Sequence, residues 1–162
     1  MEKLRSISAD LDEEALTKVE QKGRWIVFNH LHQTGKRKEA REVADMILKS
    51  LHENPDHKFE LGALGFIGQS FHADGDLEGA EVLFDRMLEI YDPKQHAELG
   101  IEFGCDPWVS AMINKALTQI HLGFPDTAVK MVDKAVEYGI ELGFPITKIS
   151  TLIYKGLMGY ML

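Results

Sequence analysis

Seven histidines are the side chains of this sequence best suited to hold a metal ion. His30 and His32 stand two positions apart, and a predicted helix end separates His52 from His57. Two ligands on one helix converge when they are three or four positions apart, whereas a spacing of two turns them about 160° away from each other. No H-E-x-x-H motif or Cys/His cluster accompanies these histidines. We therefore expect no metal site and no cofactor.

The single cysteine, Cys105, is the one thiol that could act as a nucleophile. Catalysis would need a thiolate and a positioned base. The neighbouring carboxylate of Asp106 disfavours the thiolate, although the start of the helix that follows favours it. The sequence shows no such base, no G-x-x-x-x-G-K-[ST] loop and no paired aspartates of a nucleotide cyclase. We expect an ordinary thiol and a chain that is not an enzyme.

The charge balance of the chain excludes several classes of partner. The 162 residues include 18 Lys and Arg against 26 Asp and Glu, a formal net charge of −8. Nucleic acids and anionic membrane surfaces attract clustered positive charge, so we expect neither as a partner. The N-terminus lacks the apolar segment of a signal peptide, and residues 146–162 are too short and carry two lysines. With one unpaired cysteine, these features indicate a cytoplasmic protein.

A repeated glycine turn organises the helices that would carry any binding residues. Gly35, Gly75 and Gly123 each stand five positions before an alanine. Apolar pairs follow eight and nine positions after each glycine, and again twelve and thirteen positions after it. Such a spacing forms a stripe on one face of an α-helix. Each glycine therefore predicts a turn followed by an amphipathic helix.

Helices are also predicted before each of these turns. They cover roughly 11–34, 56–74 and 107–122, and no stretch shows the alternation of a β-strand. Asp106 precedes a proline and predicts an N-cap, Gly143 predicts a C-cap, and Asp10 with Glu13 predicts a capping box.

The spacing of the turn glycines is uneven, 40 residues and then 48. The extra length falls in residues 91–106, where two glycines and a proline predict an irregular connector with a short helix over 94–100. We predict an all-α single domain over 1–162. Its parts are repeat 1 at about 11–54, repeat 2 at about 55–91, a connector over 92–106, repeat 3 at about 107–143 and a partial repeat 4 at about 145–162.

The glycine turn with its following alanine resembles the tetratricopeptide repeat, a pair of antiparallel helices that stacks into a solenoid. The small residue in the middle of the first helix is Gly68 in copy two and Ala116 in copy three, but Phe28 stands there in copy one. The resemblance implies a solenoid of about three helical hairpins plus a C-terminal helix.

A second resemblance covers about 91–145. The run Tyr91-Asp92-Pro93, His96, Phe103-Gly104, Asp106-Pro107, Val109 and Leu122-Gly-Phe-Pro-Asp-Thr-Ala128 is similar to a tetratricopeptide-like module of large bacterial multidomain regulators. There the module follows an ATPase domain. The resemblance implies a protein-interaction or scaffolding module, a fragment of a larger bacterial signalling protein. A small-molecule or peptide sensor is the alternative.

Stacked hairpins present their first helices on a concave face, where equivalent positions form rows. Six positions before the turn glycine stand Asn29, Gln69 and Leu117, and three positions before it stand His32, His72 and Ile120. We predict that Asn29, His32, Gln69 and His72 bind a protein or peptide partner. The alternative interpretation is that these polar residues are merely solvated.

The C-terminal helix is unusually apolar for the last helix of a stack, which normally has a polar outer face. Adding the shortest repeat to Gly123 puts the next turn near position 163, so we expect the chain to end where a fourth hairpin would turn. We predict an interface at Ile149, Leu152, Ile153, Leu157 and Tyr160. A second copy of the chain or a missing C-terminal segment is expected to cover it, because each large apolar side chain left exposed forfeits about 1.5–3 kcal/mol.

Overall fold

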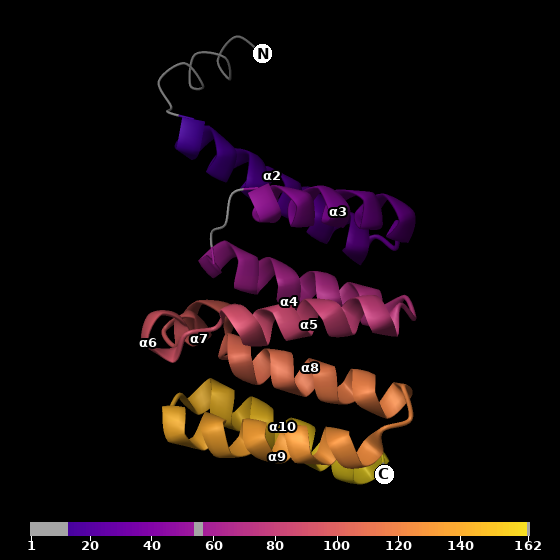
Figure 1. Ribbon diagram of the computed structural model, residues 1–162, viewed down its shortest axis with the longest axis vertical. Coiled ribbons are helices and arrows are strands. Elements are labelled where there is room, and N and C mark those ends of the chain that lie inside the picture. The colour runs from indigo at the N-terminus through magenta and orange to yellow at the C-terminus, as the bar shows by residue number, and fades with distance from the viewer. Residues whose placement is uncertain (1–12, 54–56, 162) are drawn as a thin grey trace. The chain divides into compact units, whose positions relative to one another are not determined.

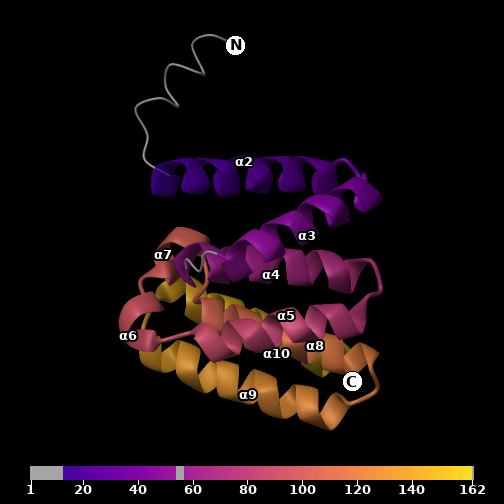
Figure 2. The same ribbon diagram turned by 45° about the horizontal axis from the view of Figure 1, so that its top comes forward.

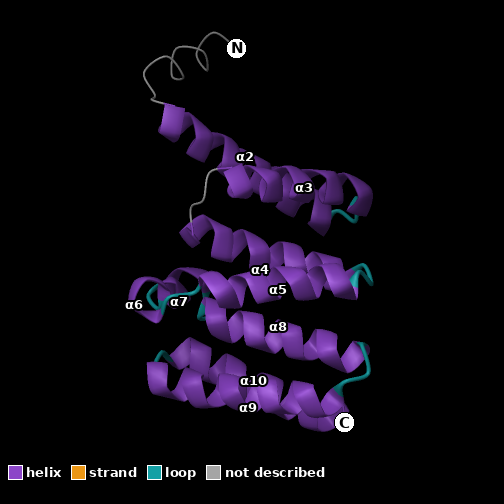
Figure 3. Ribbon diagram, viewed as in Figure 1, coloured by secondary structure: helices purple, strands orange, loops and turns teal. Residues whose placement is uncertain are grey.

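The computed structural model describes residues 13–53 and 57–161. Every regular element in these two ranges is a helix and none is a strand, which confirms the all-α class (Figure 3). The chain divides into two compact units, Met1–Pro55 and Asp56–Leu162, which are described separately. Asp10 of the expected capping box lies outside the described residues.

The first unit contains one described helical hairpin. Helix α2 (Glu13–Gln33) is followed by α3 (Arg37–Glu53), and the two helices pack together. The buried side chain of Gln21 donates a hydrogen bond of 3.3 Å from its Nε2 to Oγ of Ser50 and so joins them.

The second unit contains α4 (His57–Ala73), α5 (Leu77–Ile90), α6 (Pro93–His96), α7 (Leu99–Phe103), α8 (Pro107–His121), α9 (Pro125–Leu142) and α10 (Pro145–Met161). The long helices pack in succession, α4 on α5, α5 on α8, α8 on α9 and α9 on α10. Helix α8 also contacts α4 and α10 (Figures 1 and 2). Within this unit α4, α8 and α10 run in one direction and α5 and α9 run in the other.

The three predicted glycine turns have the same backbone geometry. Gly35, Gly75 and Gly123 have φ of 73°, 84° and 88°, a region that L side chains rarely adopt. In each turn the glycine N–H donates to the carbonyl three residues back, and the next N–H donates to the carbonyl five residues back. This pair of bonds is the Schellman motif, which satisfies carbonyls left open at a helix end. The sequence-based turn predictions are thereby confirmed.

The expected caps and connector are found with one difference. The Asp106 carboxylate accepts a bond from Val109 N, and Gly143 ends α9 with φ of 74°. Residues 92–106 hold two short helices, α6 and α7, where the sequence predicted one over 94–100. Asp92 caps α6 at a position before that range, and residues 97–98 form a turn between the two helices.

A missing side chain sets the distance between α4 and α5. A Cβ atom built on Gly68 would lie 2.6 Å from Cε1 of Phe84, whose side chain is fully buried. At the equivalent place in the next hairpin, Ala116 of α8 belongs to the same buried cluster as Val132 of α9. Glycine therefore faces a phenylalanine, and alanine faces a smaller valine.

This packing predicts opposite effects for one substitution at two glycines. Gly68→Ala is expected to lower the free energy of unfolding by about 1–3 kcal/mol, because the buried Phe84 ring has no room to move. Gly156→Ala in α10 meets nothing within 4 Å and is expected to raise the free energy by up to about 1 kcal/mol through helix propensity. Urea unfolding followed by circular dichroism measures both. Equal effects at the two glycines would contradict the close approach of Phe84.

Candidate functional site

The second unit contains a cavity of about 230 Å³ on the side of α4, α8 and α10. Its lining residues are Leu61, Gly62, Gly65, Phe66, Gln69, Met87, Phe103, Cys105, Pro107, Ser110, Ile113, Asn114, Ser150 and Tyr154. None of these carries a charge. The cavity is therefore suited to an uncharged, largely apolar group accompanied by a few hydrogen-bonding atoms.

Two rows of equivalent positions line this cavity. Thirteen positions before the turn glycine stand Gly62 in α4 and Ser110 in α8, and α10 supplies Ser150. Nine positions before the glycine stand Phe66 and Asn114, and α10 supplies Tyr154. The sequence prediction used the rows at six and three positions. The same counting, carried one and two turns further back along the helix, reaches Gly62, Phe66, Ser110 and Asn114, but it does not indicate which row faces the cavity.

The connector supplies one wall of the cavity. Phe103 at the end of α7 lies against α4 at Gly62, where a Cβ atom would be 3.1 Å from Cζ of the ring. Gly65 similarly accommodates Met87 of α5, with a Cβ to Cε distance of 3.3 Å. These two glycines leave the backbone of α4 open to large side chains, so the cavity is bounded by rings and methyl groups.

The thiol of Cys105 is a neutral part of the wall. Burial raises the pKa of Cys105 to about 11, the charge of Asp106 adds to the increase, and a hydrogen bond with Ser150 opposes it. The predicted effect of Asp106 is confirmed, although burial is the larger cause. At neutral pH the group is a thiol, and the thiol is a poor nucleophile.

Asp106 fastens the helices around the cavity. Its buried carboxylate accepts a bond of 2.6 Å from the Tyr91 hydroxyl and one of 3.1 Å from Val109 N, while its own N–H donates to Thr147 Oγ1 at 3.2 Å. The Tyr91 and Tyr138 hydroxyls are 3.1 Å apart. Burial raises the pKa of Asp106, and the bonds from Tyr91 and Val109 oppose that rise. The end of α5, the start of α8 and helix α10 thus meet at one residue, the first two at its carboxylate and α10 at its backbone N–H.

The four predicted concave residues have different surroundings. Gln69 lines the cavity. Asn29 is half-buried in the first unit, and its Nδ2 donates to Trp25 O at 3.0 Å. His32, also in the first unit, is exposed, with its ring 5.9 Å from that of Phe28. The structure brings Gln69 alone of these to the cavity.

His72 belongs to a chain of hydrogen bonds between the ends of α4 and α8. The Thr118 hydroxyl donates to Asn114 O at 3.0 Å, so Nδ1 of His72 donates to Thr118 Oγ1 at 2.9 Å. Nε2 of His72 then accepts from His121 Nδ1 at 3.1 Å. This order of protons requires a neutral His72. Burial lowers the pKa of His72, and His121 lowers it further.

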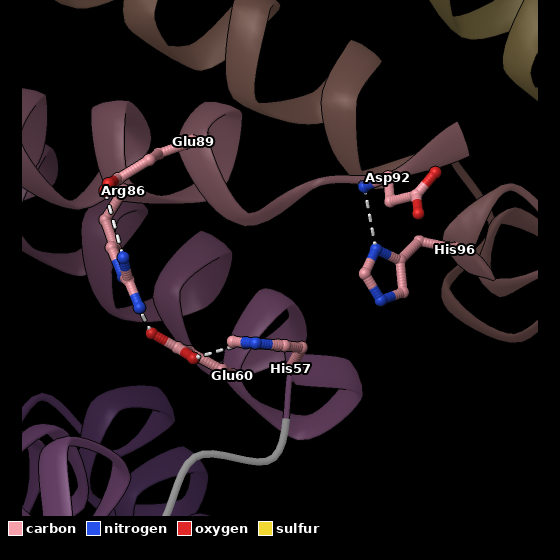
Figure 4. Close-up of polar contacts among 6 residues, drawn as sticks. All are labelled: His57, Glu60, Arg86, Glu89, Asp92 and His96. Carbon is pink, nitrogen blue, oxygen red and sulfur yellow. Dashed lines mark hydrogen bonds and ion pairs between the residues drawn. The ribbon is translucent and has the colours of Figure 1, made fainter. Parts of the chain in front are cut away.

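A second polar cluster joins α4 to α5 (Figure 4). The Glu60 carboxylate, 7 % exposed, is bonded to Arg86 Nε at 3.0 Å and to His57 Nδ1 at 3.1 Å. Arg86 also pairs with Glu89 at 2.9 Å, and His96 Nδ1 accepts from Asp92 N at 2.9 Å.

Within residues 13–53 and 57–161 no three His, Cys, Asp or Glu side chains are grouped so as to hold a metal ion.

The five residues of the predicted interface all lie on α10 and are exposed. They are Ile149, Leu152, Ile153, Leu157 and Tyr160.

No family model, curated protein or solved structure matches this chain. Among the helices in the part of the chain that the structure describes, none combines the length and the apolar character needed to cross a membrane.

The His72 contacts predict a stability that depends on pH. Because the pKa of His72 lies below its ordinary value of 6.5, the unfolded chain takes up a proton at a higher pH than the folded chain does. The contribution of His72 to the free energy of unfolding is therefore expected to fall as the pH drops below about 6.5, by at most about 1.4 kcal/mol per pH unit.

His72→Asn keeps a side-chain N–H at the place of Nδ1 for Thr118 and removes the titrating ring, so its unfolding free energy is expected to vary less over this range. Urea titrations of both chains at several pH values, from about pH 7 to about pH 5, measure the difference. Identical pH profiles would show that His72 has no part in it.

Proposed function

We propose that the second unit belongs to a tetratricopeptide-like interaction module and binds a peptide segment of another protein in the cavity between α4, α8 and α10. The repeated Schellman turns and the succession of antiparallel helices support this assignment. The resemblance of residues 91–145 to a module of bacterial regulators supports a role in a cytoplasmic signalling protein.

The observation that carries the proposal is the size of the cavity together with its uncharged lining. Its volume of about 230 Å³ is below the roughly 300 Å³ at which pockets for small-molecule ligands begin. A single bulky apolar side chain of a peptide fits this volume. The uncharged lining offers no counter-ion to a charged metabolite, and this favours a protein partner over the small-molecule sensor that the sequence left as an alternative.

The aromatic and the hydrogen-bonding residues that line the cavity would contact different parts of a bound peptide. Phe66, Phe103 and Tyr154 offer apolar surface, and burial of a large apolar side chain contributes about 1.5–3 kcal/mol. Gln69 and Ser110 offer hydrogen-bonding groups for the backbone of an extended or helical peptide. A peptide with one uncharged, bulky anchor is the expected ligand, because an ionised side chain would find no counter-ion among the lining residues.

Selection of binders from a phage-displayed library of random peptides tests this proposal. Selected peptides are expected to share one large apolar residue with no charged neighbour. Asn114→Trp fills the cavity and is expected to weaken their binding by about tenfold or more, as measured by fluorescence anisotropy.

Asn29→Trp is the matched control. Both asparagines are half-buried and donate to the carbonyl four residues back, but Asn29 lies in the first unit. Peptides that bind Asn114→Trp as well as the unchanged chain would exclude the cavity. Loss of binding in Asn29→Trp alone would instead favour the row predicted from the sequence.

A further inference from the structure

Helix α10 presents an apolar face that no described part of the second unit covers. Its buried residues are Thr147, Thr151 and Met158, which face the helices before it. On the opposite side the large apolar side chains are between 41 and 89 % exposed. They are Ile146, Ile149, Leu152, Ile153, Leu157, Tyr160 and Met161.

Helix α10 packs on α9 as α8 packs on α5. Lys115 of α8 pairs with Asp85 of α5, and Lys155, forty positions later, pairs with Asp133 of α9 at 2.9 Å. The buried residues of α10 stand forty positions after Pro107, Ala111 and Thr118, which are buried in α8. Helix α10 is therefore placed as the first helix of a further hairpin.

The exposed face of α10 is equivalent to the face of α8 that α9 covers. Val109, Met112 and Ile113 of α8 are buried in a cluster with Ala135 of α9, and Ala116 is buried in a cluster with Val132. Forty positions later stand Ile149, Leu152, Ile153 and Gly156. The chain itself thus shows what these positions accept, which is an antiparallel amphipathic helix.

Gly156 specifies the size of the residue opposite. Gly68 lets the Phe84 ring of α5 lie on the backbone of α4, whereas Ala116 faces the smaller Val132. A Cβ atom on Gly156 would meet nothing within 4 Å. By this rule the helix that covers α10 carries an aromatic side chain over Gly156.

The charges on α10 further restrict which kind of helix can cover it. Helix α10 carries Lys148 and Lys155 and no acidic residue, and Lys155 already pairs with Asp133 of α9, so α10 of a second copy would bring no carboxylate to Lys148. Helix α5, which covers a glycine-containing helix in this chain, has four acidic residues and one arginine. An acidic helix complements α10 better than a second copy does.

We propose that the outer face of α10 binds an acidic amphipathic helix of a partner protein, antiparallel to α10, with an aromatic side chain seated over Gly156. This surface is separate from the cavity and is formed by the opposite side of the helix from Thr151. It adds one helix to the stack.

A labelled synthetic peptide of residues 76–91, the α5 segment of this chain, is the probe, because it has the required acidic residues and aromatic. It is expected to bind the full chain in an anisotropy titration, and the same peptide with Phe84→Ala is expected to bind at least about tenfold more weakly. Absence of binding up to about 1 mM peptide, or equal binding of the two peptides, would overturn the proposal.

Substitutions in the chain locate the binding face. Gly156→Leu fills the place of the aromatic ring, and Ile153→Glu adds a charge that repels the acidic peptide. Each is expected to weaken binding by at least about tenfold with circular dichroism unchanged, since both positions are exposed. Val82→Glu is the matched control, 66 % exposed on α5 against 62 % for Ile153, and is expected to leave binding unchanged.

Two outcomes would contradict binding at the outer face of α10, and one variant distinguishes this binding from binding in the cavity. Binding that survives Gly156→Leu would place the peptide elsewhere, including on α4 in exchange for α5. Self-association of the unchanged chain that Ile153→Glu abolishes would assign the face to a second copy. Asn114→Trp is expected to leave α5-peptide binding intact, so failure of either proposal is distinguishable from failure of the other.

Discussion

The arrangement of the second unit depends on the buried residue Asp106. Capping of α8 through Val109 is local, but the bond from Tyr91 to the carboxylate and the bond from the Asp106 N–H to Thr147 join segments that are distant in the sequence. A buried carboxylate without the bonds from Tyr91 and Val109 would be costly. The three bonds therefore fix how α8 leaves the connector, and the cavity wall formed by Pro107 and Ser110 begins at this point.

Local chemistry made much of the fold predictable from the sequence. The turn glycines adopt positive φ because the Schellman bonds require it, and the proline after Asp106 marks a helix start. The cap at Asp106 was predictable, whereas its burial and its bond to Tyr91 were not. Those depend on which segments meet in space, and helical spacing alone does not determine that.

The candidate site was less predictable for the same reason. Counting from a glycine finds rows of equivalent residues, but it does not say which row faces a groove, because the angle between neighbouring helices decides that. Of the residues counted six and three positions before the glycines, Gln69 lies at the cavity. The rows at nine and thirteen, and Phe103 lying against Gly62, emerge only once α4, α7 and α8 are placed together.

The pairing of small and large residues links the fold to its outer surface. Association costs a partner several kcal/mol of lost freedom, so an exposed apolar face alone gives little affinity. A ring that lies on a glycine backbone buries more area than one held off by a Cβ atom, as Phe84 on Gly68 illustrates. Gly156 repeats that condition on α10, which also carries Lys148. The packing of an aromatic ring on a glycine joins α4 to α5. The same packing therefore predicts that a helix with an aromatic side chain over Gly156 would bind α10 most tightly.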